Sequence, residues 1–115
     1  MTCARIIYWR ARPGQLDAYS RYLHAYVEPI DEAARVAGVL RSYATWIDST
    51  PGAPWTHMRL FVFDDVAQRD VMKDGLARIA AQLTPDATQR AQRAALAETL
   101  RDKAGEQDLD SLPGT

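Results

Sequence analysis

The chain has 115 residues, with 14 lysines and arginines against 15 aspartates and glutamates and a formal net charge of −1 at pH 7. This length fits one domain that buries its own core without metal or disulfide support. The near-neutral charge argues against a nucleic-acid-binding protein, which normally carries a basic excess. The single cysteine, Cys3, excludes an intrachain disulfide and a cysteine-based metal cage.

The N-terminal residues lack the basic start and the apolar stretch of a secretory signal. The longest apolar runs, such as residues 60–63, are far shorter than the ~20 residues that span a bilayer. We therefore predict a cytoplasmic protein that has neither membrane nor nucleic acid as a partner.

The first half of the chain predicts a strand followed by a helix. Residues 4–12 are rich in β-branched and aromatic side chains, and Pro13 and Gly14 form a turn that ends this strand. Apolar residues then recur at spacings of three and four, as in an amphipathic helix. Pro29 should kink or restart this helix, and Gly38 should end it.

The second half predicts a hairpin, two helices and a tail. Residues 39–47 and 55–63 are strands joined by the proline- and glycine-containing loop 48–54, so they should pair antiparallel. An Asp-x-x-Gln capping box and a later Thr-Pro pair mark the starts of two helices. The two helices and an acidic C-terminal tail are predicted over residues 65–83, 84–103 and 106–115.

The resulting order is strand, helix, strand, strand, helix, helix. It predicts an α+β fold, in one domain over residues 1–105, with a three-stranded antiparallel sheet and helices on one face. Alternate strand residues form two registers: an apolar one with Ile7 and Leu60, and an aromatic and basic one with Tyr8 and Phe61. Neither register has the composition of a solvated surface, so we expect helices on one sheet face and a second copy of the chain on the other.

Three features carry a family resemblance: the strand-turn-helix start over residues 11–19, the Ala-Gly helix end at 37–38, and the hairpin end 61–65 before a helix. With them, residues 4–83 resemble the dimeric α+β barrel superfamily, a ferredoxin-like group that includes antibiotic-biosynthesis-monooxygenase-like proteins. The resemblance implies a homodimer in which two sheets form a barrel. It also implies activities as different as cofactor-free oxygenation, polyketide cyclisation and haem breakdown, among which a fold does not choose.

Two histidines are candidate acid or base groups, because histidine titrates near neutral pH. His24 lies in the first helix, and His57 lies at the start of the third strand, where we expect it near Tyr43 or Arg41 across the hairpin. In a family-like enzyme, His24 or His57 would move a proton and Tyr43 would assist. The alternative is that each histidine is a partly buried packing residue.

Arginines and aromatic residues are the candidate substrate-binding groups. Arg41 and Arg59 could hold an anionic group, since guanidinium matches carboxylate and phosphate in shape. Tyr19 and Trp46, together with Trp9 and the other tyrosines of the first helix, could line an aromatic pocket. The alternatives are that the arginines pair with helix carboxylates and that the aromatic residues form core.

We predict no metal site and no cofactor, because the histidines are 33 positions apart and no metal-binding or nucleotide-binding motif occurs. The leading hypothesis is a homodimeric barrel that binds a small aromatic or anionic organic molecule. Its activity would be cofactor-independent monooxygenation, cyclisation or isomerisation. The alternative is a non-catalytic homodimerisation module, whose sheet face serves only assembly.

Overall fold

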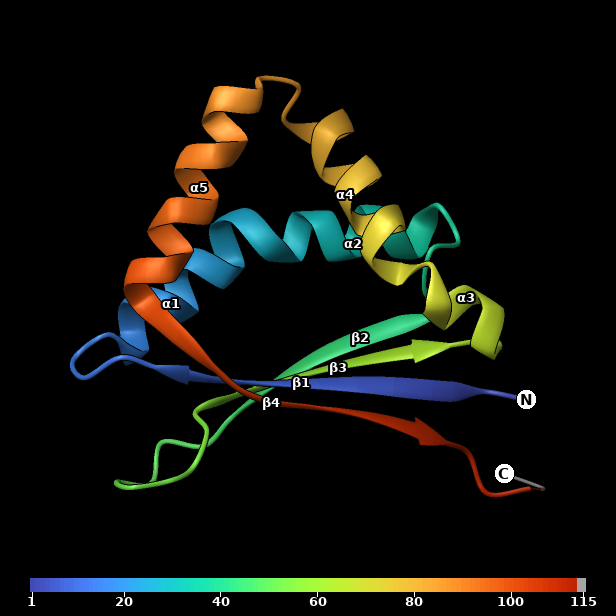
Figure 1. The fold of residues 1–115 in the computed structure, drawn as a ribbon, viewed down its shortest axis with the longest axis horizontal. Coiled ribbons are helices and arrows are strands. Elements are labelled where there is room, and N and C mark those ends of the chain that lie inside the picture. The colour runs from blue at the N-terminus through green and yellow to red at the C-terminus, as the bar shows by residue number, and fades with distance from the viewer. Residues whose placement is uncertain (114–115) are drawn as a thin grey trace.

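The computed structural model of the chain describes residues 1–113, in which one antiparallel sheet lies beneath a layer of helices (Figure 1). None of the helices in this part of the chain is long and apolar enough to cross a membrane. In chain order the elements are β1 (Cys3–Ala11), α1 (Leu16–Tyr22), the π-helix η1 (Leu23–Val27), α2 (Glu28–Val36), β2 (Ser42–Ile47), β3 (His57–Phe63), α3 (Val66–Asp70), α4 (Met72–Leu83), α5 (Ala87–Leu100) and β4 (Arg101–Asp110).

The sheet has four strands in the order β2-β3-β1-β4, so the predicted three-stranded sheet was wrong. The helix expected to reach residue 103 ends at Leu100, and half of the expected tail belongs to β4. This edge strand has no apolar alternation that could reveal it. It is held by its backbone pairing with β1 and by the ion pair between Arg5 Nε and Asp108 Oδ1 at 2.8 Å. Residues 114 and 115 of the expected tail lie outside the described residues.

The first helical segment shows the predicted interruption at Pro29. The backbone stays helical from residue 16 to residue 36, but the turn just before Pro29 widens into the π-helix η1. Proline lacks an N–H group and its ring crowds the carbonyl four residues earlier, so a wider turn relieves both problems. Gly38 then ends the segment with φ at 77°, a left-handed conformation that favours glycine.

All the helices lie on one side of the sheet (Figure 1). On that side Ile7 lies opposite Arg59, and on the other side Ile6 lies opposite Leu60. The predicted grouping of Ile7 with Leu60 was therefore wrong, because alternation sorts residues within a strand but pairing decides which sets share a face. The side without helices, called the helix-free face below, carries Ala4, Ile6, Tyr8, Arg10, Ser42, Ala44, Trp46, Met58, Leu60 and Val62 on its first three strands.

Two clusters of buried apolar residues join the helices to the sheet. One lies beneath α2 and α4 around Phe63 and Met72, and the other lies beneath α1 and α5 around Tyr19 and Leu100. In the first cluster α4 lies very close to Val39 at the position of Gly75, where an added Cβ would lie 2.6 Å from Val39 Cγ1. A glycine in mid-helix weakens the helix by itself, so its place here is explained by this contact.

We predict that Gly75→Ala lowers the free energy of unfolding by about 1–3 kcal/mol, because overpacking outweighs the gain of about 1 kcal/mol in helix propensity. Urea denaturation of the single variant measures this loss. The matched control is the double variant with Val39→Ala, which removes the clashing methyl groups. Its loss should be smaller than the sum of the two single losses, and strict additivity would contradict the contact.

Candidate functional site

A pocket of about 160 Å³ lies between the sheet and the helices α1 and η1. We call it the inner pocket. The aliphatic part of its lining consists of Ile7, Leu23 and Val27, and the rest of its wall is aromatic and basic. That part is formed by Trp9, Tyr19, Tyr22, Phe61, Arg59 and Arg101.

Arg101 is the first residue of β4, and its guanidinium lies against the Trp9 ring with Cζ 3.5 Å from the ring centroid. The Tyr19 ring centroid lies 5.6 Å from the same atom. This stacking fixes the cation by its attraction to the aromatic faces. The Nε atom of Arg101 is buried, and within residues 1–113 it has no hydrogen-bond partner. A buried donor left unsatisfied costs about 1–3 kcal/mol, so an acceptor that reached it would bind favourably.

Arg59, on the helix-covered side of β3, is the second basic residue of the inner pocket. Its two terminal nitrogens donate to both carboxylate oxygens of Asp31 at 2.8–2.9 Å, and its Cζ lies 5.0 Å from the Phe61 ring centroid. Burial raises the pKa of Asp31 to about 6, while the charge of Arg59 and its hydrogen bonds oppose the rise. Because Arg59 already has this carboxylate partner, Arg101 is the basic group with more capacity for a ligand.

Tyr19 lies between the arginines and the buried histidine of the sheet. Its side chain is almost completely buried, and its ring packs edge-on against His57 with 4.6 Å between ring centroids. Burial raises the pKa of the Tyr19 hydroxyl, although the nearby charges of Arg101 and Arg59 oppose the rise. The hydroxyl therefore stays protonated at neutral pH and can serve as a hydrogen-bond donor.

His57 is fully buried, and both of its ring nitrogens are occupied. Ser20 Oγ lies 2.9 Å from Nε2, and Thr56 Oγ1 lies 2.8 Å from Nδ1. The Ser20 hydroxyl also donates to the Leu16 carbonyl at 3.0 Å, and the Thr56 hydroxyl lies 3.4 Å from the Trp9 carbonyl, so each ring nitrogen faces a hydroxyl group that can donate or accept. Burial and the charge of Arg59 lower the pKa of His57 to about 4. His57 is therefore an uncharged side chain that packs against the Tyr19 ring.

The remaining predicted site residues lie away from the inner pocket. His24 is largely exposed and pairs with the glutamate one turn later at 3.0 Å. Arg41 is exposed at the start of the hairpin, and Trp46 is 61% exposed on the helix-free face. Tyr43 donates to a glutamate of α2 at 3.0 Å. From the predicted set the structure thus brings together Tyr19, Arg59 and His57, and with them Trp9 and Tyr22 of the predicted aromatic residues.

Sequence reasoning missed Arg101, the residue with the most distinctive geometry. The predicted helix extended past it, which placed it on a solvated helical face. Its only sequence signal is its position directly after the alanine-rich run that forms α5. Asp31 and Thr56, which hold Arg59 and His57, carry no motif either: Asp31 is 28 positions from its partner, and Thr56 is only the residue before its partner.

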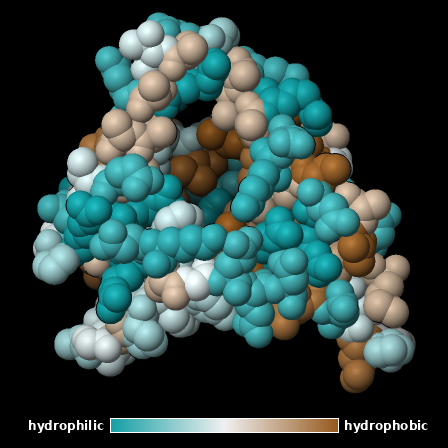
Figure 2. Space-filling view, viewed as in Figure 1, coloured by the Kyte–Doolittle hydropathy of each residue, from teal (hydrophilic) through white to brown (hydrophobic). Residues whose placement is uncertain are grey.

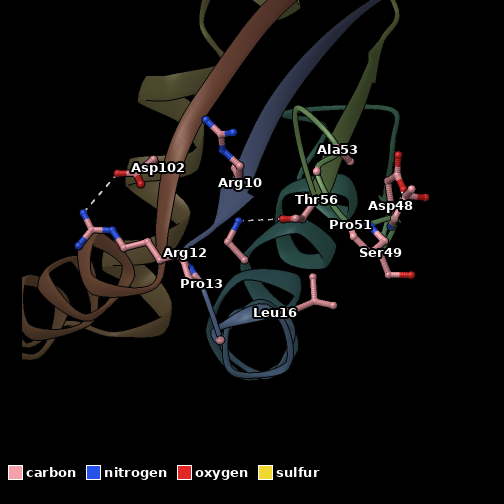
Figure 3. A pocket seen from close by; sticks show the side chains of 14 residues that line it. Arg10, Arg12, Pro13, Leu16, Asp48, Ser49, Pro51, Ala53, Thr56 and Asp102 are labelled. Carbon is pink, nitrogen blue, oxygen red and sulfur yellow. Dashed lines mark hydrogen bonds and ion pairs between the residues drawn. The ribbon is translucent and has the colours of Figure 1, made fainter.

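Two other pockets bear on where a ligand could bind. A pocket of about 250 Å³, called the outer pocket below, lies between η1, α4 and α5. A larger, open pocket of about 540 Å³ lies between the end of β1 and the loop 48–53 (Figure 3). In this loop pocket Arg12 pairs with Asp102 at 3.2 Å, and Thr56 accepts from the backbone of Ala11 (Figure 3). Because it is open and no aromatic side chain lines it, it is a weaker site for an aromatic ligand than the inner pocket.

Within the described residues no three histidine, cysteine, aspartate or glutamate side chains gather as a metal site requires. No protein-family model matches the sequence. No curated protein matches it either.

Several solved structures share the fold. HapK from Hahella chejuensis is 13% identical, with a TM-score of 0.61 over 98% of this chain and 95% of that chain. A Chloroflexus aurantiacus J-10-fl protein described as a "putative Antibiotic biosynthesis monooxygenase" is 20% identical, with a TM-score of 0.59 over 100% and 97%. A dimeric protein of unknown function with a ferredoxin-like fold from Bacteroides fragilis NCTC 9343 is 12% identical, with a TM-score of 0.57 over 96% of each chain.

The chain has a ferredoxin-like α+β fold. This likeness confirms the predicted fold class and the resemblance to the antibiotic-biosynthesis-monooxygenase-like group at the level of architecture. At these identities the comparison shows fold alone, so the activity must be argued from the pocket.

The buried, neutral state of His57 predicts a pH dependence of stability. Its pKa is about 4 in the folded chain and 6.5 ordinarily, so the unfolded chain binds an extra proton between these values. His57 should therefore lower the stability of the folded chain on acidification through this window, by an amount on the order of 2–3 kcal/mol. Asp31, whose pKa is raised to about 6, acts in the opposite direction, so the contribution of His57 is read from the difference between wild type and a His57 variant.

The test compares urea denaturation of wild type and His57→Gln from pH 7 to pH 4. The variant should lose less stability than wild type over this range, so the gap between them should narrow. His24→Gln, which removes the exposed histidine, is the matched control. Parallel curves for wild type and His57→Gln would refute the neutral buried state.

Proposed function

We propose that the inner pocket binds a small aromatic organic anion, with its negative charge held beside Arg101. The observation that carries the proposal is the Arg101 guanidinium, stacked on Trp9 with its buried Nε unsatisfied at the wall of an aromatic pocket. A guanidinium presents a planar set of donors suited to a carboxylate, phenolate or enolate. The surrounding rings supply stacking surface for the aromatic part of the ligand.

The same charges suggest how the pocket would activate its ligand. Two positive groups beside a phenol or enol stabilise its ionised form, so they lower the pKa of the substrate itself. This route needs no general base from the protein, which agrees with a neutral His57 whose nitrogens are both occupied. An electron-rich phenolate or enolate can react with dioxygen or with an internal electrophile. We therefore propose cofactor-independent monooxygenation, cyclisation or isomerisation as the activity.

We predict that Arg101→Met weakens the binding of 4-hydroxybenzoate at least tenfold, because the variant keeps a similar side-chain length but loses the charge and its donors. Isothermal titration calorimetry measures the affinity, and circular dichroism checks the fold. Arg78→Met, at an exposed position of α4, is the matched control and should bind as wild type does. Equal affinity of Arg101→Met and wild type would refute the assignment of Arg101.

The helix-free face supports a second proposal, namely that the chain forms a homodimer through this face. Its residues are mainly apolar across three strands, and Trp46 is 61% exposed there. An apolar surface of this extent on a sheet is typical of an interface. The Bacteroides fragilis neighbour is described as dimeric, which is in line with this proposal. If the inner pocket binds no ligand, assembly itself becomes the better candidate function.

We predict that wild type scatters light as a particle of twice the 12.9 kDa chain mass, and that Trp46→Glu shifts it toward the monomer. A buried carboxylate at the interface would lack a partner, which disfavours association. Val36→Glu, at a hydrophobic position of α2 that is 73% exposed, is the matched control and should remain dimeric. A monomeric wild type at micromolar concentration would contradict the proposal.

A further inference from the structure

The inner and outer pockets meet at the same residues. Tyr22, Val27 and Arg101 line both of them. We infer that the two pockets are compartments of one site, which takes an elongated two-ring organic anion rather than a single-ring one. This inference rests on the proposed function and adds to it the size and orientation of the ligand.

The volumes favour one divided site over two separate ones. Ordinary ligand pockets measure about 300–1,000 Å³. The inner pocket, at about 160 Å³, and the outer pocket, at about 250 Å³, each fall below this range. Their combined volume falls within this range. The inner compartment alone suits one ring, and a ligand that fills both compartments needs a second ring beyond the junction.

Small side chains create the outer compartment. Ala80 of α4 and Ala94 and Ala97 of α5 line it, so the two helices stand apart above η1. Figure 1 shows α4 and α5 diverging downward from the connection between them, over the α1–α2 segment. Figure 2 shows a hollow between these two helices, with hydrophobic residues at its base. The outer compartment is therefore open to solvent on this side.

The residues at which the two compartments meet are held in place by contacts with other elements. The Tyr22 hydroxyl donates to the backbone carbonyl of Arg93 at 2.9 Å, which ties α1 to α5. On the other side Arg101 is stacked on Trp9. A ligand that extends from one compartment into the other would thus lie between the Tyr22 ring and the Arg101 guanidinium, both of which are held in position by these contacts.

The charges orient the ligand. Arg93 stacks on Tyr26 with Cζ 4.4 Å from the ring centroid and donates to Thr84 at 2.9 Å, so its guanidinium is already engaged. The Glu98 carboxylate also lines the outer compartment and repels an anion there. The negative group of the ligand is therefore expected beside Arg101 at the junction, with one ring stacked inward and the other lying against the alanines.

Two probes and two variants test the inference by calorimetry. The probes are 4-hydroxybenzoate, which has one ring, and 4′-hydroxybiphenyl-4-carboxylate, which adds a second ring in line. Ala94→Trp fills the outer compartment from an exposed position of α5, where a larger side chain does not disturb the core. Ala95→Trp, at the neighbouring exposed position that does not line this compartment, is the matched control.

We expect wild type and Ala95→Trp to bind the two-ring probe at least tenfold more tightly than the one-ring probe. Ala94→Trp should remove this advantage and leave one-ring binding within twofold of wild type. If both probes bind wild type equally, or if Ala94→Trp weakens both to the same degree, the divided site is wrong and the proposed function stands. If neither probe binds wild type, the proposed function fails and the inference fails with it.

Discussion

The pairing of β4 with β1 is the interaction on which the candidate site depends. It begins where α5 ends, as the backbone N–H of Arg12 donates to the carbonyl of Leu100 at 2.8 Å. The next residue is Arg101, so the first step of the strand sets the guanidinium on the Trp9 ring. The same pairing anchors the C-terminal end of α5, and this helix forms one wall of the outer pocket. One edge strand with little apolar content thereby positions both a cation and a helix.

The helix-covered side of the sheet shows how buried polar groups are accommodated. Arg59 and His57 lie two residues apart on β3, facing the helices, where burial would be costly for unpartnered charge. Arg59 is matched by the two oxygens of Asp31, and His57 gives up its charge and bonds to two hydroxyl groups. Arg101 differs from both because its Nε remains unsatisfied. This contrast is the reason we propose Arg101, rather than Arg59 or His57, as the group that binds the ligand.

The sequence was sufficient to predict elements that have a strong local signal. The strand before Pro13, the interruption at Pro29 and the end at Gly38 follow from backbone chemistry, and all three are found in the structure. Strand β4 could not be predicted, because its stability comes from pairing across a long sequence separation, as in the contact of Arg5 with Asp108. The candidate site followed the same rule: Tyr19 and Arg59 were predicted from their residue type and strand or helix pattern, whereas Arg101 could be placed only with the missing strand.

In the proposed site, the edge position of β4 would link ligand binding to local folding. Edge strands with exposed side chains open more readily than central ones, and here an opened strand would carry Arg101 away from Trp9. The inner pocket then exists only in the fraction of molecules in which this strand is closed, and the apparent affinity is reduced by that fraction. A ligand bound beside Arg101 would in turn hold the strand closed. Strand β4 thus helps to close a pocket whose other walls come from β1, α1, η1 and β3.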